Sequence, residues 1–123
     1  MPKYMLLLYR PERETSASER PLWAEFDESL REAGIHLAGS PLYPTDAATT
    51  VRVRDEETEI VDGPFAVTKE FLVGYYLLEC TDLDEALGHA ARVPLARYGS
   101  VEVRPVMDLG APVPPGEEAA AAS

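Results

Sequence analysis

Two short stretches of the chain are apolar at almost every position. Residues 3–9 have the sequence KYMLLLY, and residues 73–80 have the sequence VGYYLLEC. Successive side chains of a strand point to opposite faces, so each stretch predicts a strand that is apolar on both faces. Helices packed on one side of such a sheet would leave the other side in water. We therefore expect a second layer there, supplied by another copy of the chain in a homodimer.

A first helix is predicted after the polar connector that follows residue 11. It is expected to begin near Ser16 or Ser18, because Ser16 and Glu19 have capping-box spacing. Gly34 can adopt the left-handed conformation that ends a helix. The predicted buried stripe consists of Leu22, Phe26, Leu30 and Ala33, with Trp23 on its flank. The residues expected to face solvent are Asp27, Glu28, Arg31 and Glu32.

A second helix is predicted after the second apolar strand. Asp82 and Glu85 have the spacing of a capping box, and Pro94 stops the helix. The predicted buried stripe consists of Leu83, Leu87, Ala90 and Ala91.

The remaining elements are shorter strands. Residues 35–42 are expected to be extended, residues 49–62 to form a hairpin with Val51 and Val53 facing inward, and residues 100–107 to form the last strand. The order β-α-β-β-(turn)-β-α-β predicts an α+β fold. It is the ferredoxin-like split βαβ arrangement with an inserted β-hairpin.

A rigid turn is predicted between the hairpin and the second apolar strand. Its residues are Asp62, Gly63, Pro64 and Phe65. Gly63 permits positive φ, Pro64 fixes φ, and Phe65 is expected to pack into the core below the turn. Two roles stay open: a purely structural turn, and a turn that holds Asp62 at the mouth of a cleft.

Lys69 and Glu70 follow this turn. As neighbours in an extended segment they point in opposite directions, so one is expected to face the cleft and the other solvent or a partner chain. An ordinary surface ion pair is one interpretation. An anion-binding Lys69, acting with Arg104, is another.

Composition and charge exclude several classes of function. The net charge is −11, from 22 acidic and 11 basic residues, so nucleic acid and anionic membrane surfaces are not expected as partners. No apolar run approaches the roughly 18 residues of a membrane span, and a cytoplasmic location is expected. The single cysteine, Cys80, excludes an internal disulfide and is predicted to be a small core residue.

The two ends of the chain differ in composition. Residues 1–107 are expected to form one domain. Residues 108–123 contain three prolines and no apolar period, which predicts a disordered or loosely attached tail. Neither His36 nor His89 has metal-ligand spacing, so no metal and no other cofactor is expected.

Several of these segments together resemble the YCII-related, DGPF-domain family. They are YMLLLY, TTVRVRD, DGPFAVTKEFLVGYYLLE, DLDEALGHAARVP and GSVEVRPVM, in that order. The resemblance implies a dimeric α+β barrel in which two ferredoxin-like sheets meet face to face. It also implies a regulatory context, because members of this family are often encoded beside alternative sigma factors.

One functional feature of the related enzymes does not carry over. They have a proposed His–Asp pair, with the His after an Arg-Pro in the first helix and the Asp before a Pro late in the second. Here Arg20-Pro21 is followed by Leu22 and Trp23, and Arg92-Val93 precede Pro94. An indole cannot exchange a proton at neutral pH, so this dyad is absent.

Two classes of function remain. The first is a small-molecule-binding or regulatory module, a dimeric barrel whose cleft is lined by Tyr4, Trp23, Tyr75, Tyr76 and a few charged groups. The second is a small cofactor-free enzyme that uses Asp62, Lys69 or His36 to transfer protons on a small carbonyl or aromatic substrate. The candidate ligand-binding residues are Asp62, Lys69, Glu70, Arg104, Tyr4, Trp23 and His36.

Overall fold

The computed structural model describes residues 1–11, 17–65 and 69–108. Its main elements, in chain order, are β1 (Lys3–Arg10), α1 (Arg20–Glu32), β2 (His36–Pro41), β3 (Thr49–Arg54), β4 (Glu57–Asp62), β5 (Phe71–Glu79), α2 (Leu83–Ala91) and β6 (Ser100–Pro105). Short 3-10 turns lie at Ala17–Glu19, Thr45–Ala47 and Pro94–Arg97.

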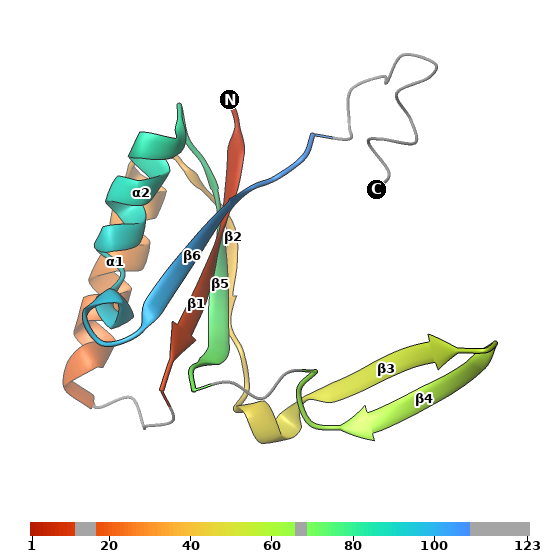
Figure 1. The fold of residues 1–123 in the computed structure, drawn as a ribbon. Helices are drawn as coiled ribbons and strands as arrows, with labels where there is room; N and C mark the ends of the chain where they lie inside the picture. Colours follow the sequence, from red (N-terminus) through yellow and green to blue (C-terminus); the bar gives the residue numbers. More distant parts are fainter. Residues whose placement is uncertain (12–16, 66–68, 109–123) are drawn as a thin grey trace, which may run out of the picture.

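Four strands form an antiparallel sheet in the order β2-β5-β1-β6 (Figure 1). The connections through α1 and α2 give the split βαβ arrangement, so the predicted ferredoxin-like fold is confirmed. The strands β3 and β4 form a separate hairpin between β2 and β5, as predicted. This hairpin projects away from the sheet and helices.

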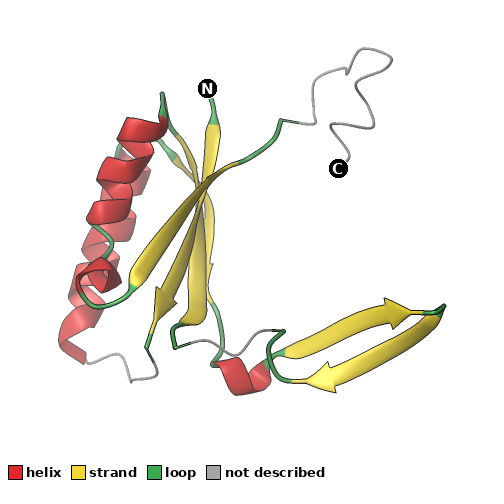
Figure 2. Ribbon diagram, in the orientation of Figure 1, coloured by secondary structure: helices red, strands yellow, loops and turns green. Residues whose placement is uncertain are grey.

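Both helices cover the same face of the four-stranded sheet (Figure 2). The side chains of β1 and β5 that point to this face are buried, and they form the core with the inner faces of the helices. The buried apolar residues are Tyr4, Leu6, Leu8, Phe26, Leu30, Ile35, Tyr76, Leu78, Cys80, Ala86, Ala90, Val93 and Leu95. Cys80 is therefore a core residue, as predicted, and burial raises the pKa of its thiol.

Local chemistry fixes the ends of the helices. Gly34 has φ 74° and ends α1 as expected. The Asp82 side chain accepts a hydrogen bond from the Glu85 N–H at 2.9 Å, which confirms the N-cap of α2. The N-cap of α1 is Glu19, whose carboxylate accepts a hydrogen bond from the Tyr98 hydroxyl at 2.6 Å. The capping box predicted for α1 includes Ser16, which lies outside the described residues.

The buried stripes of the helices were predicted only in part. In α1, Phe26 and Leu30 are buried as expected, whereas Leu22 and Ala33 are exposed. In α2, Ala90 is buried as expected, but the prediction was wrong for Leu83 and Leu87, each 46% exposed, and for Ala91, which is also exposed. The helix turns Ala86 and Ala90 to the sheet instead; two alanines let α2 lie close to the strands.

None of the described residues covers the face of the sheet opposite the helices (Figure 2). Its central side chains are Met5 and Leu7 from β1, and Tyr75 and Leu77, which pair with them from β5. All four are partly exposed. The predicted two-faced apolar character of β1 and β5 is therefore present, and one of the two faces is open.

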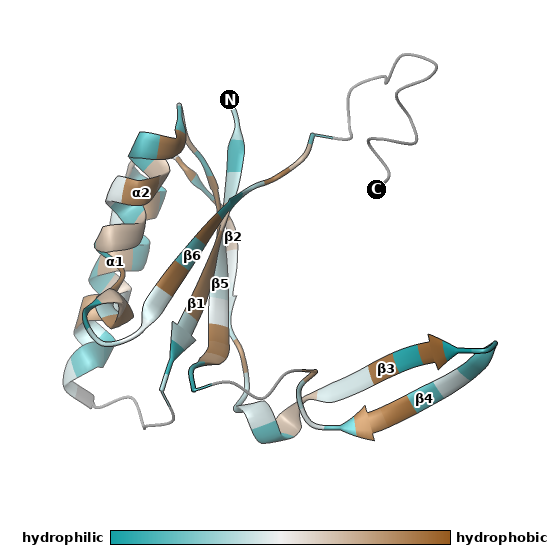
Figure 3. Ribbon diagram, in the orientation of Figure 1, coloured by the Kyte–Doolittle hydropathy of each residue, from teal (hydrophilic) through white to brown (hydrophobic). Residues whose placement is uncertain are grey.

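The hairpin corrects a prediction about inward-facing residues. Val51 and Val53 were expected to face the core, but both are exposed, as is Ile60, the partner of Val51 in β4. Apolar bands are visible on both strands of this projecting arm (Figure 3). The alternation was correct, but the part of the chain that the structure describes supplies no third layer against which the apolar face of the hairpin could pack.

The turn after the hairpin is formed as predicted, but its anchor is not. Gly63 has φ 106°, and its N–H donates to the Ala48 carbonyl at 2.7 Å. Phe65 is 76% exposed, so the expectation that it packs into the core was wrong. Its ring contacts the Arg52 guanidinium, whose central carbon lies 5.4 Å from the ring centroid.

The C-terminal tail and membrane-spanning helices were the subject of two further expectations. Residues 109–123 lie outside it, so the loosely attached tail and the domain boundary at residue 107 stay predictions. Among the described residues, no helix is long and apolar enough to cross a membrane.

The two phenylalanines provide a matched test of where the core lies. Phe26 is 5% exposed, so Phe26→Ala should lower the free energy of unfolding by about 3–5 kcal/mol. Phe65→Ala should cost less than about 1 kcal/mol, because it removes little buried surface. Urea unfolding of both variants measures the difference. Equal costs would show that Phe65 is covered by a second chain.

Candidate functional site

A pocket of about 730 Å³ opens between α1 and the β2 side of the sheet. Helix α1 supplies one wall, and the strands β1, β2 and β5 supply the other. The described residues that line it are Leu8, Arg10, Arg20, Trp23, Ala24, Asp27, Gly39, Ser40, Pro41, Leu42, Val73, Gly74, Tyr75, Tyr76 and Leu95. The size is in the range of sites that hold a small organic molecule.

The helical wall of the pocket is a stripe beside the buried stripe of α1. Arg20, Trp23, Ala24 and Asp27 occupy positions i, i+3, i+4 and i+7, so they share one side of the helix. The neighbouring positions Phe26 and Leu30 are buried in the core. Packing of the core stripe therefore presents the second stripe to the pocket.

A glycine in β2 shapes the opposite wall. A Cβ atom added at Gly39 would lie 2.7 Å from Cδ1 of Tyr76 and 3.0 Å from the backbone oxygen of Tyr75. The absence of a side chain therefore lets the Tyr76 ring lie directly over β2. Tyr75 also borders the pocket, although strand alternation points its side chain to the opposite face from Tyr76.

Tyr76 joins the core to the pocket. Its ring lies 5.5 Å from the Phe26 ring at 79°, in an edge-to-face contact, and 6.0 Å from the His36 ring. Burial, with the Asp27 charge as the second cause, raises the pKa of Tyr76 to about 12. The phenol is therefore neutral at physiological pH and keeps a hydroxyl proton that it can donate.

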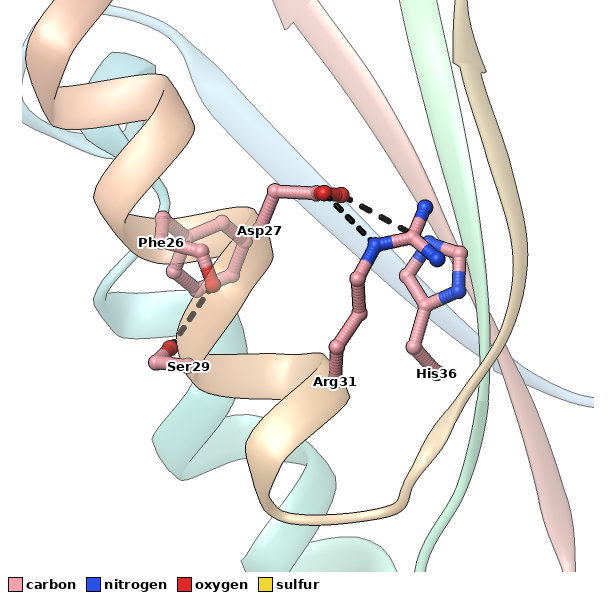
Figure 4. Close-up of polar contacts among 5 residues, drawn as sticks. All are labelled: Phe26, Asp27, Ser29, Arg31 and His36. Carbon is pink, nitrogen blue, oxygen red and sulfur yellow. Dashed lines mark hydrogen bonds and ion pairs between the residues drawn. The ribbon is translucent and has the colours of Figure 1, made fainter.

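Asp27 is the one carboxylate among the described lining residues. Figure 4 shows its carboxylate pointing toward Arg31, one turn further along α1, and toward His36 of β2. The Arg31 Nε atom donates to Asp27 Oδ2 at 2.8 Å. The His36 Nε2 atom lies 3.6 Å from Oδ1, which is within ion-pair distance but beyond a hydrogen bond.

His36 stands behind Asp27 and does not line the pocket. Its side chain is 8% exposed, and its ring is enclosed between Asp27 and Tyr76. A protonated His36 would stabilise the charge of Asp27, but a molecule in the pocket meets Asp27 first. The arrangement can therefore orient a polar ligand group through Asp27, with Arg31 and His36 as its supports.

The structure brings together only some of the predicted site residues. Trp23 lines the pocket and His36 lies next to it, whereas Tyr4 is buried in the core. The other four predicted residues, Asp62, Lys69, Glu70 and Arg104, do not line this pocket.

Those four residues lie on the hairpin, the following loop and the last strand. Asp62, Lys69 and Arg104 are exposed, and Glu70 is partly buried. The Arg104 Nε atom is 3.9 Å from Glu102 Oε2. A role for Asp62 and Lys69 in ligand binding stays a prediction.

Two pocket residues were missed by the sequence reasoning. Arg20 was noted only as part of an Arg-Pro pair, and Asp27 was assigned to the solvated face of α1. The available signal was their spacing of seven residues with Trp23 between them, which places all three on one side of a helix. Among the described residues, no group of three His, Cys, Asp or Glu side chains is placed to hold a metal ion.

The buried phenol of Tyr76 should make stability depend on pH in the alkaline range. Its pKa is near 10 in an unfolded chain and about 12 in the folded protein. The folded state holds the proton more tightly, so this contribution is complete below pH 10 and is lost as the pH rises to 12. The free energy of unfolding should therefore fall by about 2–3 kcal/mol over this range from this group.

Chemical denaturation at a series of pH values measures this loss. The Tyr76→Phe variant should lose less stability between pH 10 and 12 than the wild type. Tyr43→Phe is the matched control, because Tyr43 is exposed, and it should behave like the wild type. An identical pH dependence in all three proteins would contradict the assignment.

Comparison with known proteins places the chain in a family. An uncharacterized protein of Rhizobium meliloti is 41% identical over 116 residues, which cover 84% of this chain and 90% of that protein. A solved 5-chloro-2-hydroxyhydroquinone dehydrochlorinase from Burkholderia phenoliruptrix, in complex with 2,5-dihydroxybenzoquinone, covers 84% of this chain and 93% of its own, with a TM-score of 0.46 and 15% identity. The family model of the YCII-related domain matches residues 2–110, and the chain belongs to that family.

Proposed function

We propose that the protein is a small-molecule-binding module, with the pocket between α1 and β2 as its ligand site. The observation that carries this proposal is the composition of the pocket wall. An apolar lining that includes Leu8, Val73 and Leu95 surrounds a few polar groups, among them Asp27 and the Tyr76 hydroxyl. Pockets with that balance use apolar surface for affinity and the polar groups for orientation.

The supports of the polar groups favour recognition of a ligand. Asp27 is held by Arg31 at 2.8 Å, and Tyr76 is fixed by Phe26 and by the close approach of Gly39. Side chains that are fixed before a ligand arrives lose little entropy on binding. A regulatory role, as expected from the family resemblance, fits a module of this kind.

The single tryptophan of the chain gives this proposal a direct test. Trp23 lines the pocket, so its indole N–H gives one assignable nuclear magnetic resonance signal at the site. A library of small aromatic and carbonyl compounds should contain members that shift this signal and saturate. Trp23→Phe should remove the signal and leave the fold intact, which confirms the assignment.

The outcome of the screen separates the possible functions. Saturable shifts with the compound recovered unchanged support a binding module. If no compound shifts the Trp23 signal, while compounds shift signals elsewhere, the pocket is not the ligand site and the proposal fails.

A cofactor-free proton-transfer enzyme is the second candidate. The specific observation in its favour is the Asp27 carboxylate, which borders the pocket with His36 behind it at 3.6 Å. In that case Asp27 is the group that meets the substrate, and a small carbonyl or aromatic compound acquires solvent deuterium during the same screen in D2O. Deuterium incorporation that Asp27→Asn abolishes would favour the enzyme over the binding module.

We further propose that the protein works as a homodimer. The open face of the sheet places Met5 and Leu7 beside Tyr75 and Leu77, and no described residue of the chain covers these four side chains, which are all partly exposed. A second copy, with the same open face, supplies a matching surface, and a two-fold interface of this type buries both at once. The open faces of the two sheets then meet face to face, which is the dimeric α+β barrel expected from the family resemblance.

A charged residue at the centre of the open face tests the dimer. Light scattering at micromolar concentration should give twice the 13.5 kDa mass of the chain. Leu7→Lys should shift the mass to the monomer, because it would bury an unpaired charge in the interface. Leu22→Lys, on the exposed side of α1, is the control and should stay dimeric. A monomeric wild type contradicts the proposal.

A further inference from the structure

The charge of the pocket wall differs in sign from that of the chain. The chain has 22 acidic and 11 basic residues, yet the charged residues among the described lining are Arg10, Arg20 and Asp27. The charge of Asp27 is already offset by Arg31 at 2.8 Å. An acidic protein therefore presents a positively charged wall in its pocket.

Arg20 is the residue on which this positive charge depends. It is the first residue of α1, its side chain is exposed, and within residues 1–11, 17–65 and 69–108 it makes no ion pair or side-chain hydrogen bond. A guanidinium presents two parallel N–H donors that match the two oxygens of a carboxylate. Arg10 also borders the pocket, from β1.

The spacing along α1 limits the length of the ligand. Arg20 and Asp27 are seven residues apart on one side of the helix, which corresponds to about 10 Å along its axis. Trp23 lies between them and offers an aromatic surface. An anionic group at one end, a flat ring in the middle and a hydrogen-bond donor at the other end would match these three side chains in order.

We propose that the pocket binds an aromatic acid with a hydroxyl group opposite its carboxylate. The carboxylate lies against Arg20, the ring lies against Trp23, and the hydroxyl donates to Asp27. This inference rests on the proposed function of the pocket as a ligand site, and it specifies the chemical class of the ligand.

A pair of probes of equal shape tests the charge. The full chain is titrated with 4-hydroxybenzoate and with 4-hydroxybenzamide, which is uncharged, while the Trp23 indole signal is followed. The acid should bind about tenfold more tightly than the amide, the difference expected for one charge-assisted contact at a pocket rim. Added salt should weaken binding of the acid and leave that of the amide unchanged.

Matched variants assign the preference to a residue. Arg20→Gln should reduce the affinity for the acid to that for the amide, and Arg20→Lys should restore part of it. Arg54→Gln makes the same change in net charge on the hairpin, outside the pocket lining, and should keep the full preference. Asp27→Ala removes the acceptor, so in this variant 4-hydroxybenzoate should bind no more tightly than benzoate, which lacks the hydroxyl.

The possible failures are distinguishable. Equal affinity for acid and amide, or a preference that survives in Arg20→Gln, overturns this inference and leaves the pocket as a ligand site. The inference is also overturned, and the pocket is kept as a ligand site, if uncharged compounds shift the Trp23 signal while 4-hydroxybenzoate and 4-hydroxybenzamide do not. If no compound at all shifts that signal, the proposed function falls together with the inference.

Discussion

The edge-to-face contact between Phe26 and Tyr76 is the interaction on which both the core and the pocket depend. Tyr76 lies on β5, which is next to the edge strand β2, and Phe26 lies on α1. The centroids of the two rings are 5.5 Å apart. On its other side Phe26 meets Arg92 at the end of α2, whose guanidinium carbon is 5.4 Å from the ring and whose Nη2 donates to Ser29 Oγ at 2.6 Å. One aromatic pair thus fixes α1 against the sheet and, through Arg92, against α2.

The pocket is a geometric consequence of this contact. Because Phe26 packs into the core, the neighbouring stripe of α1, which includes Trp23 and Asp27, faces β2 at the edge of the sheet. Gly39 allows the Tyr76 ring to occupy the floor, because any Cβ there would meet that ring at 2.7 Å. The packing of Phe26 and Gly39 therefore also determines where the Asp27 and Trp23 side chains can contact a ligand.

The strands and helices were predictable because each depends on a short repeat in the sequence. Apolar stretches gave β1 and β5, alternation gave β6, and capping chemistry gave the start of α2. A local pattern cannot give the presence of a covering layer. Val51 and Val53 alternate as a buried strand would, yet none of the described residues forms a third layer on their hairpin, and Phe65 is exposed for the same reason. Local pattern identifies the apolar face of an element, but only tertiary structure determines what covers it.

The same limit applies to the candidate site. Trp23 and His36 could be named because the chain has one tryptophan and two histidines. Asp27 could not, because on a helix the side that forms a pocket wall has the same polar composition as the side that faces water. The Arg31 contact that appeared to mark a solvated face is the one that holds the Asp27 carboxylate in place.

Within the described residues, two apolar surfaces have no covering layer: the open face of the sheet and the projecting hairpin. A two-stranded hairpin is only marginally stable by itself in water. The net charge of −11 on each copy opposes association, so a dimer requires that apolar burial exceed the repulsion between copies. The central residues of the open face, Met5, Leu7, Tyr75 and Leu77, are uncharged, which keeps the repulsion at the periphery of any interface.

The position of Asp27 favours recognition over proton transfer. Accepting a hydrogen bond from a ligand leaves its charge in place, so the ion pair with Arg31 at 2.8 Å is kept. Accepting a proton would neutralise that charge and cost the ion pair, and His36 at 3.6 Å is too far to replace the lost contact by a hydrogen bond. A ligand that donates to Asp27 meets a carboxylate that its ion pair with Arg31 already orients, so the geometry is better suited to holding a hydroxyl group than to removing its proton.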